Sequence, residues 1–229
     1  MSLYSILLIC SILVPLSLSF DKKLQFYKQW KYLIPAIMGV AFFYIIFDIF
    51  FTLIGVWGFN STYHSSIVFF QLPLEEWLFF FVIPYSSIFL HDSIVLYFNK
   101  IKLSIYFAKY LTIIILLASI VIVLTNLDKA YTVYIFSWVI LALILTFFDK
   151  THVVRHYYLT FLVILLPFLA VNSILTGSFI DEPIVWYDND ENLNIRFLTI
   201  PIEDFGYAFS LILFNLLLRN KLKDRIHGI

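Results

Sequence analysis

The chain has 229 residues, of which 62% are hydrophobic and only 13% are charged, and its formal net charge is zero. A soluble domain is usually about 45–50% apolar and about 25% charged, so a soluble fold of this length cannot bury so much apolar surface. The neutral balance excludes the basic face of a nucleic-acid-binding protein, and the single cysteine, Cys10, excludes an intramolecular disulfide and a cysteine-based metal cluster. The composition therefore predicts an integral membrane protein.

Seven apolar runs approach the roughly 20 residues that cross a bilayer as a helix. In chain order they cover residues 2–20, 33–54, 71–90, 105–125, 131–148, 158–176 and 200–218. The first run lacks the basic start and the small-residue cleavage site of a signal peptide, so we expect it to remain as a helix. The predicted fold class is all-α, with about seven transmembrane helices.

The basic residues predict the orientation of these helices. All Lys and Arg except Lys129 and Arg196 fall in connections on one side of the predicted membrane. The positive-inside rule makes that side cytoplasmic. We therefore expect a multi-pass protein of the cell membrane with its N-terminus outside and its C-terminus in the cytoplasm, and with external connections at 55–70 and 177–199.

Three short motifs occur twice in the same order, which predicts an internal repeat. The pairs are Phe20–Lys22 with Phe148–Lys150, Val56–Trp57 and Asn60 with Val185–Trp186 and Asn189, and Pro73–Glu76 with Pro201–Asp204. The first and last pairs share an offset of 128 residues, and the middle pair needs a gap of one. We expect two three-helix halves, residues 1–92 and 131–229, joined by a connector helix in 93–130. One connector makes the halves parallel, so both acidic motifs enter the membrane from the outer side.

The acidic motifs, Glu75–Glu76 and Glu203–Asp204, have two interpretations. Proline followed by acids is a common helix start, because free N–H groups and the helix dipole favour negative charge there. Carboxylates inside a membrane, however, usually face a cavity or the bundle interior. Neighbouring residues point about 100° apart on a helix, so only one acid of each pair can face a shared cavity, and the sequence does not say which.

Further side chains near the acids are candidates for the same site. Asp48 is a third acid within an apolar run, either as a catalytic group or as a structural hydrogen-bond partner. Aromatic residues flank the acids, and their π faces attract positive charge, although Trp and Tyr also gather at membrane interfaces. They are Trp57, Trp77, Phe79, Phe80, Phe81, Tyr85, Trp186, Tyr187 and Tyr207.

Other polar clusters predict no cofactor site. His152 and His156 form one H-x-x-x-H pair, whereas a di-iron site needs several, so we expect a surface cluster. The external run 188–191 can hold a hard cation through oxygen ligands or be a solvated loop, and we favour the loop. No dinucleotide fingerprint and no P-loop are present. We therefore expect neither a metal nor an organic cofactor.

Several of these motifs together resemble a known family. Phe47–Asp48, Gly55–Asn60 and Leu72–Phe80 resemble the first lycopene cyclase domain, which occurs in heterodimeric bacterial cyclases and in fused forms. Leu175–Phe179, Pro183–Tyr187 and Ile200–Asp204 resemble the second domain. The resemblance covers nearly the whole chain, in the order of the fused proteins.

The resemblance implies a lycopene β-cyclase, an isomerase of carotenoid biosynthesis. An acid protonates the ψ end of an acyclic carotenoid, an internal double bond closes a six-membered ring, and a base removes a proton to leave a β-ionone ring. It implies Glu75 and Glu76 as essential, with Glu203, Asp204 and Asp48 as further catalytic candidates, whereas the second motif departs from the family's pattern at Asp204. We expect substrate contacts from Trp57, Asn60, Trp77, Trp186 and Tyr85. The implied partners are a carotenoid substrate such as lycopene, the lipid bilayer and other enzymes of the pathway, with no nucleic acid.

Three other functions fit the sequence less well. A proton-coupled transporter also has repeats and buried acids, but the acids here gather near one side of the membrane. A membrane prenyltransferase needs several cations for a diphosphate, and the external acidic loop has only Arg196 nearby. A retinal photoreceptor needs a Schiff-base lysine, which the run 200–218 lacks.

Overall fold

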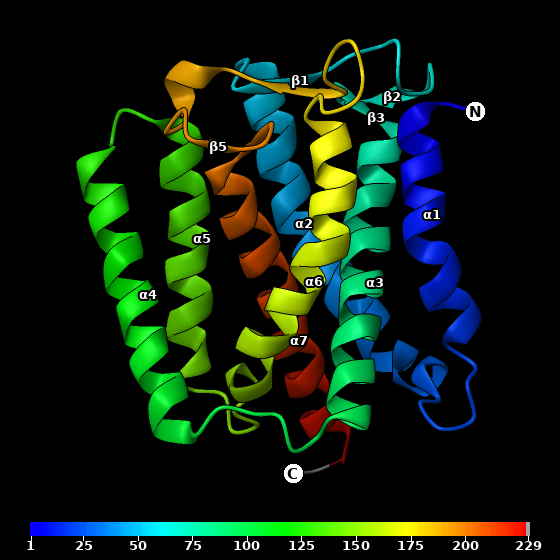
Figure 1. Cartoon of the computed structure of the whole chain (residues 1–229), viewed down its shortest axis with the longest axis vertical. Coiled ribbons are helices and arrows are strands. Elements are labelled where there is room, and N and C mark those ends of the chain that lie inside the picture. The colour runs from blue at the N-terminus through cyan, green and yellow to red at the C-terminus, as the bar shows by residue number, and fades with distance from the viewer. Residues whose placement is uncertain (228–229) are drawn as a thin grey trace.

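The computed structural model describes residues 1–227, with side chains through residue 225, and is 69% helical. The described residues form seven α-helices: α1 (Leu3–Leu18), α2 (Trp30–Leu53), α3 (Leu74–Tyr97), α4 (Ile105–Thr125), α5 (Ala130–Thr146), α6 (Val154–Leu175) and α7 (Ile202–His227). Two 3₁₀ turns, η1 (Phe26–Gln29) and η2 (Asn189–Glu191), lie in connections. Each predicted apolar run therefore overlaps one α-helix (Figure 1).

The helices have the length and surface of a membrane protein. Four stretches are long and apolar enough to cross a bilayer: Phe26–Leu53, Leu74–Tyr97, Ile105–Thr125 and Val154–Leu175. Helices α1 and α5 are apolar but shorter. Large hydrophobic side chains such as Phe42, Leu53 and Leu166 are exposed on the flank, where a soluble protein of this size would carry polar residues. Hydrocarbon is the solvent that suits this surface.

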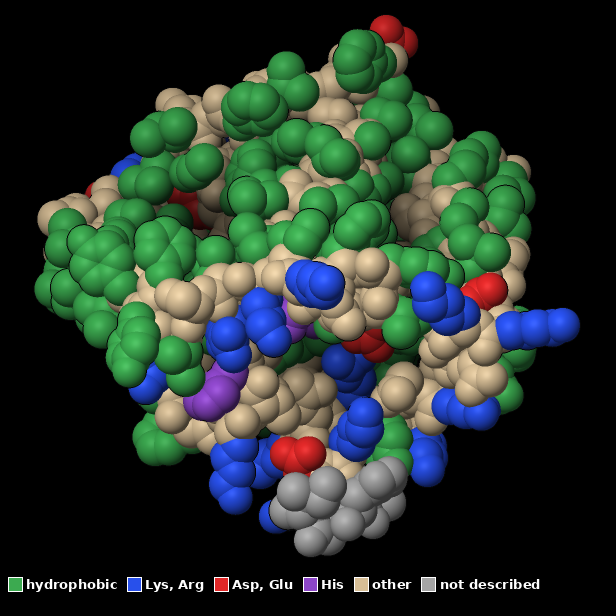
Figure 2. Space-filling model, turned by 60° about the horizontal axis from the view of Figure 1, so that its bottom comes forward, with side chains coloured by type: hydrophobic (Ala, Val, Ile, Leu, Met, Phe, Trp, Pro, Cys, Tyr) green, Lys and Arg blue, Asp and Glu red, His purple; other side chains and the backbone are tan. Residues whose placement is uncertain are grey.

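Helices α3 and α7 hold the bundle together from the middle. Helix α3 packs against α1, α2 and α6, and α7 packs against α2, α5 and α3. Helix α4 lies outside this group against α5 and α6. The N-terminus and all the short strands lie at one end of the bundle, here called the strand end, and the C-terminus lies at the other, the C-terminal end (Figure 1). Lys and Arg side chains gather on the C-terminal end (Figure 2).

Three two-stranded antiparallel ladders cover the strand end, so the all-α prediction was incomplete. Strand β1 (Trp57–Phe59) pairs with β4 (Val185–Tyr187), β2 (Val68–Phe69) with β3 (Leu72–Pro73), and β5 (Arg196–Phe197) with β6 (Ile200–Pro201). In the β1–β4 ladder Gly58 lies opposite Trp186, and a Cβ on Gly58 would come within 2.4 Å of the Trp186 ring. Glycine therefore lets the two external connections meet at close range.

The other two ladders are hairpins that lead directly into the acidic motifs. In the first, Phe70 and Gln71 both have positive φ (51° and 68°), which two-residue hairpin turns require but L side chains rarely adopt. The amide of Leu74 then donates to the carbonyl of Ile67 at 2.9 Å. The hairpin thereby fixes where α3 begins and which way its first side chains point.

Candidate active site

A cavity of about 460 Å³ lies inside the bundle below the strand end. Side chains of α1, α3, α6 and α7 line it, together with residues of α2, β1 and β4. Its lining is mostly apolar and contains three acids, Asp48, Glu76 and Asp204. Their exposed fractions are 3%, 8% and 4%, so all three carboxyl groups are withdrawn from solvent.

The first acidic pair divides its two side chains between the loop and the cavity. Glu75 does not line the cavity and accepts hydrogen bonds from the hydroxyls of Ser2 (2.6 Å) and Ser5 (2.8 Å), and from the amide (2.8 Å) and hydroxyl (2.9 Å) of Ser65. Glu76 does line it and accepts one hydrogen bond, from the Tyr4 hydroxyl at 2.5 Å. Glu75 thus fastens the start of α3 to α1 and the external loop, and Glu76 is the acid that faces the cavity.

The second acidic pair divides in the same way. Glu203 accepts from the hydroxyl of Thr132 (2.7 Å) and the amide of Leu193 (2.8 Å), outside the cavity. Asp204 lines the cavity and accepts from Tyr131, from Asn172 at 2.8 Å and from the Tyr187 hydroxyl at 3.1 Å. The second acid of each motif is therefore the one that faces the shared space, which answers the question that the sequence left open.

Asp48 joins these acids from α2. Its Oδ1 accepts a hydrogen bond of 2.7 Å from the indole of Trp57, and its Oδ2 is buried without a partner among the described residues. The carboxyl is close enough to Glu76 for their charges to interact. Asp48 is thus both a hydrogen-bond partner and a third acid of the cavity, and the two interpretations offered by the sequence do not exclude one another.

An aromatic wall surrounds the acids. Trp57 packs edge-on against Tyr131 with 5.1 Å between ring centroids, and Tyr131 stacks on Tyr187 at 5.4 Å. Phe79 and Tyr207 also line the cavity. Burial raises the pKa of Tyr187, which lies in β4 outside the helices, and the nearby Asp204 carboxylate raises it further. Tyr187 is therefore a protonated donor to Asp204 at neutral pH, and the wall as a whole offers π faces to a cation.

Of the five expected substrate contacts, only Trp57 lines this cavity. The side chain of Asn60 donates to Glu182 in the external loops, Trp77 donates to the Phe69 carbonyl, and Trp186 is 43% exposed above Gly58. Tyr85 lies far down α3, where its hydroxyl bonds to Ser19 and Trp30. Nearness in sequence to an acidic motif therefore did not distinguish residues that line the cavity from residues of the external loops or of other parts of the bundle.

Three polar residues of the site were missed by sequence reasoning: Tyr4, Tyr131 and Asn172. Tyr4 and Tyr131 lie in the first turns of α1 and α5, and each is followed by a hydroxyl residue, Ser5 and Thr132. Both tyrosines bond to the cavity acid, and both hydroxyl residues bond to the outer acid. That shared dipeptide was the signal available in the sequence.

The cavity extends from the acids along a groove between α1 and α6, with α3 as its floor. Cys10 and Val14 of α1 lie on one side and Pro167 and Phe168 of α6 on the other. Cys10 is exposed and Val14 is 58% exposed, so the groove reaches the flank of the bundle that hydrocarbon would cover. Pro167, which lacks an amide hydrogen, interrupts the backbone ladder of α6 beside the groove. An apolar ligand can reach the acids from the bilayer by this path.

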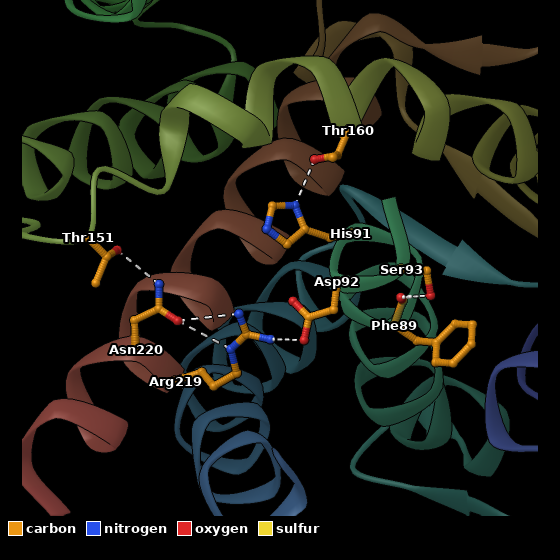
Figure 3. A network of polar contacts seen from close by, with 8 residues as sticks. All are labelled: Phe89, His91, Asp92, Ser93, Thr151, Thr160, Arg219 and Asn220. Carbon is orange, nitrogen blue, oxygen red and sulfur yellow. Dashed lines mark hydrogen bonds and ion pairs between the residues drawn. The ribbon is translucent and has the colours of Figure 1, made fainter. Parts of the chain in front are cut away.

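A separate polar network ties α3 to α7 near the C-terminal end (Figure 3). The guanidinium of Arg219 contacts the carboxylate of Asp92 at 2.7 Å, and Asn220 donates to Thr151 at 3.1 Å. His91 bonds to the hydroxyl of Thr160 at 2.7 Å. None of these polar side chains lines the cavity, so the network holds the bundle together away from the site.

No group of three or more His, Cys, Asp or Glu among the described residues is arranged to hold a metal ion. Among the described residues, His152 and His156 therefore have no third side chain with which to hold a metal ion.

Comparison with known families gives a match over most of the chain. The model of the family described as lycopene cyclase matches residues 1–94 and 128–222. No curated protein and no solved structure matches the chain.

Proposed function

The chain belongs to the lycopene cyclase family and is a carotenoid cyclase of the membrane, and we propose that it is a lycopene β-cyclase that isomerises ψ end groups to β-ionone rings. The observation that carries this proposal is the convergence of Asp48, Glu76 and Asp204 on one apolar cavity that opens to the flank of the bundle. Acid-catalysed closure of a polyene needs a proton donor, a base and an environment without water. This cavity has three acids with unlike hydrogen-bond partners, an aromatic wall and a lipid-facing groove.

In this mechanism the polyene lies in the groove between α1 and α6, with its ψ end at the acids. Glu76 donates a proton to the terminal double bond, which leaves a tertiary cation. An internal double bond attacks that cation, and the new carbon–carbon bond closes the ring. Asp204 then removes a proton from the ring, and the remaining electron pair forms the ring double bond. One proton is given and one is taken, so the product is an isomer of the substrate.

The hydrogen bonds support this division of roles. Asp204 accepts from three donors, and bonds to the charged form of a carboxyl favour that form. Glu76 accepts from one donor in an apolar surrounding, which favours the neutral acid. The anion of Asp204, together with the rings of Tyr131 and Tyr187, also stabilises the cation between the two proton transfers. Glu75 and Glu203 are then positioning residues that fix the start of α3 and α7.

We further propose that all seven helices span the membrane as two parallel halves, residues 1–92 and 131–229, joined through residues 93–130. Equivalent hydrogen bonds support the repeat. The amide of Ser65 donates to the Glu75 carboxylate, and the amide of Leu193 donates to the Glu203 carboxylate. The amide of Leu74 donates to the Ile67 carbonyl, and the amide of Ile202 donates to the Ile195 carbonyl. Each pair of bonds differs by 128 residues.

The same offset continues through the external loops. The backbone amide of Asp188 donates to the Val56 carbonyl, and the backbone amide of Asn60 donates to the Ile184 carbonyl. Adding 128 to Asn60 and to Val56 gives Asp188 and Ile184, so each bond is the counterpart of the other. These bonds align Val56 with Ile184, one residue from the sequence match with Val185, and the alignment keeps a gap just before them, because Gly55 and Gly177 follow α2 and α6 at an offset of 122. Two strands that pair in this reciprocal way are related by a two-fold axis along the bundle, which supports parallel halves.

The termini and the charges support a particular orientation. The N-terminus lies at the strand end and the C-terminus at the opposite end, which carries the Lys and Arg side chains (Figures 1 and 2). The positive-inside rule then favours a cytoplasmic C-terminal end and an external strand end.

The direct test is conversion of lycopene by membranes that contain the protein, followed by absorption spectra and chromatography against standards with β and ε rings. We expect products with β rings from the wild type and from Asp181→Asn, which changes an exposed acid of the external loop. Glu76→Gln and Asp204→Asn should yield almost none. Unchanged lycopene with the wild type, or ε rings as the main product, would contradict the proposal.

A further inference from the structure

A second hollow lies on another flank of the bundle, between α2, α5 and α7. Its volume is about 710 Å³, within the range of about 300–1,000 Å³ typical of small-molecule sites. Phe43, Trp138, Leu141 and Phe214 form part of its apolar wall. Phe43 and Leu141 are 55% and 43% exposed, so the hollow is a groove on the surface that lipid would cover.

This groove does not reach the acids. Tyr44 closes its inner side, stacking on Trp138 with 5.3 Å between ring centroids and donating a hydrogen bond of 2.8 Å to Ser210. Phe214 packs edge-on against Trp138 at 5.3 Å. None of Asp48, Glu76 and Asp204 lines it. A chain bound here is therefore outside the site of ring closure.

One end of the groove is charged, which distinguishes it from the groove between α1 and α6. Lys150, Lys221 and Arg225 line this end, together with Asp149 and Asp224. The Asp149 carboxylate already accepts three hydrogen bonds, from the amide and hydroxyl of Thr151 and from the amide of Val153.

The three cations at this end make no ion pair with another described side chain. Among the side chains of residues 1–225 the one ion pair is that of Arg219 with Asp92. Lys and Arg side chains are the prominent charges on this end of the molecule (Figure 2). The groove therefore combines an apolar channel with an end at which three cations face two carboxylates, a net charge of +1.

We propose that this groove is a binding site for an anionic phospholipid of the leaflet that meets the C-terminal end. An acyl chain lies along Phe43, Trp138 and Leu141, and the phosphate is bound by Lys150, Lys221 and Arg225. Charge complementarity selects the occupant, because cations next to a membrane surface attract anionic lipids more than zwitterionic ones. The proposal concerns a site separate from the catalytic cavity and stands or falls independently of the reaction.

Trp138 makes the site measurable. We would titrate the purified, delipidated protein in detergent with phosphatidylglycerol whose acyl chains are brominated, and with the matching phosphatidylcholine. Bromine quenches tryptophan fluorescence at contact. The signal from Trp138 is the difference between the wild type and Trp138→Phe, which keeps the other four tryptophans.

We expect saturable quenching of Trp138 at a concentration of phosphatidylglycerol at least about tenfold below that of phosphatidylcholine. Replacing Lys150, Lys221 and Arg225 by Gln together should abolish this preference. The matched control replaces Lys22, Lys100 and Lys109, which are exposed cations outside the groove, and should keep it.

Three results would overturn the proposal. Equal half-saturation by the two lipids would make the groove a general hydrocarbon contact. An equal loss in the control variant would show attraction by the surface charge as a whole. Quenching that survives in full in Trp138→Phe would place no acyl chain in the groove. Circular dichroism and size-exclusion chromatography establish that each variant is folded before titration.

Discussion

Glu75 and Glu76 are neighbours with different surroundings, and the structure predicts different failures when each is changed to Gln. Glu76 makes one hydrogen bond and faces the cavity, so Glu76→Gln changes little in the packing but removes the transferable proton. General acid catalysis contributes about 10²–10⁴-fold to a rate, or roughly 3–5 kcal/mol of barrier. We expect the rate of ring formation to fall by that factor while the thermal stability stays within about 1 kcal/mol of the wild type.

Glu75→Gln should fail mainly in stability. Its carboxylate accepts four hydrogen bonds, from Ser2, Ser5 and both donors of Ser65. Three of these bonds end on Oε1 and one, from the Ser65 hydroxyl, on Oε2, so the amide keeps the three and donates its NH₂ to that hydroxyl. All four bonds then lose their charge. Hydrogen bonds contribute about 1.5–3 kcal/mol to a charged group and about 0.5–1.5 kcal/mol to a neutral one, so the free energy of unfolding should fall by about 2–4 kcal/mol.

The assay separates the two effects by measuring turnover per folded molecule. Thermal unfolding in detergent gives the stability, and initial rates on lycopene are divided by the amount of monodisperse protein. Glu75→Gln should retain at least about a tenth of the wild-type rate per folded molecule, because its side chain does not touch the cavity. A stable Glu75→Gln with no activity, or an active Glu76→Gln, would refute the assignment of the second acid as the proton donor.

Three further outcomes test the fold. In a Cys10→Ser background, a cysteine at Ser61 should react with an impermeant thiol reagent from outside the cell and one at Lys223 should not; the reverse pattern would refute the proposed orientation. Gln71→Gly should raise the free energy of unfolding by about 1 kcal/mol, because a β-carbon is disfavoured at φ 68°, and Gln71→Ala should not. Asp92→Asn should lower it by about 3 kcal/mol, because it leaves the buried guanidinium partner uncompensated, and a loss below about 1 kcal/mol in thermal unfolding would contradict that role.

Hydropathy predicted the helices well because each one is apolar nearly all round, so that length alone marks it. It placed the ends of α3 and α7 too early, at residues 90 and 218. Both helices continue past these residues, to Tyr97 and His227, and include Asp92 and Arg219, which form an ion pair that an apolar window cannot register. The short strands have only two or three residues, too few for an alternating pattern to appear.

The sequence singled out the acidic pairs but could not say which acid of each pair lines the cavity. Helix geometry states that one acid of each pair faces the cavity, yet the choice depends on donors from distant segments. Ser2 and Ser5 donate hydrogen bonds to Glu75, which lies 70 or more residues away, and Tyr4 donates one to Glu76. Such long-range partners are set by tertiary packing, and a motif read alone does not contain them.

A difference between α2 and α6 within the proposed repeat makes the two cavity acids Glu76 and Asp204 unlike. The ends of α2 and α6 match at an offset of 122 residues, because the amides of Ile54 and Thr176 make the same two bonds and Gly55 and Gly177 follow with positive φ. The counterpart of Asn172 in the proposed repeat is therefore Phe50. Asn172 lines the open groove and donates to Asp204. Phe50 has no side-chain donor and does not line the cavity. The proposed two-fold repeat brings two carboxylates to one place, and the difference between Asn172 and Phe50 gives Asp204 a donor that Glu76 lacks. Two acids with unequal partners suit a reaction in which one must give a proton while the other takes one.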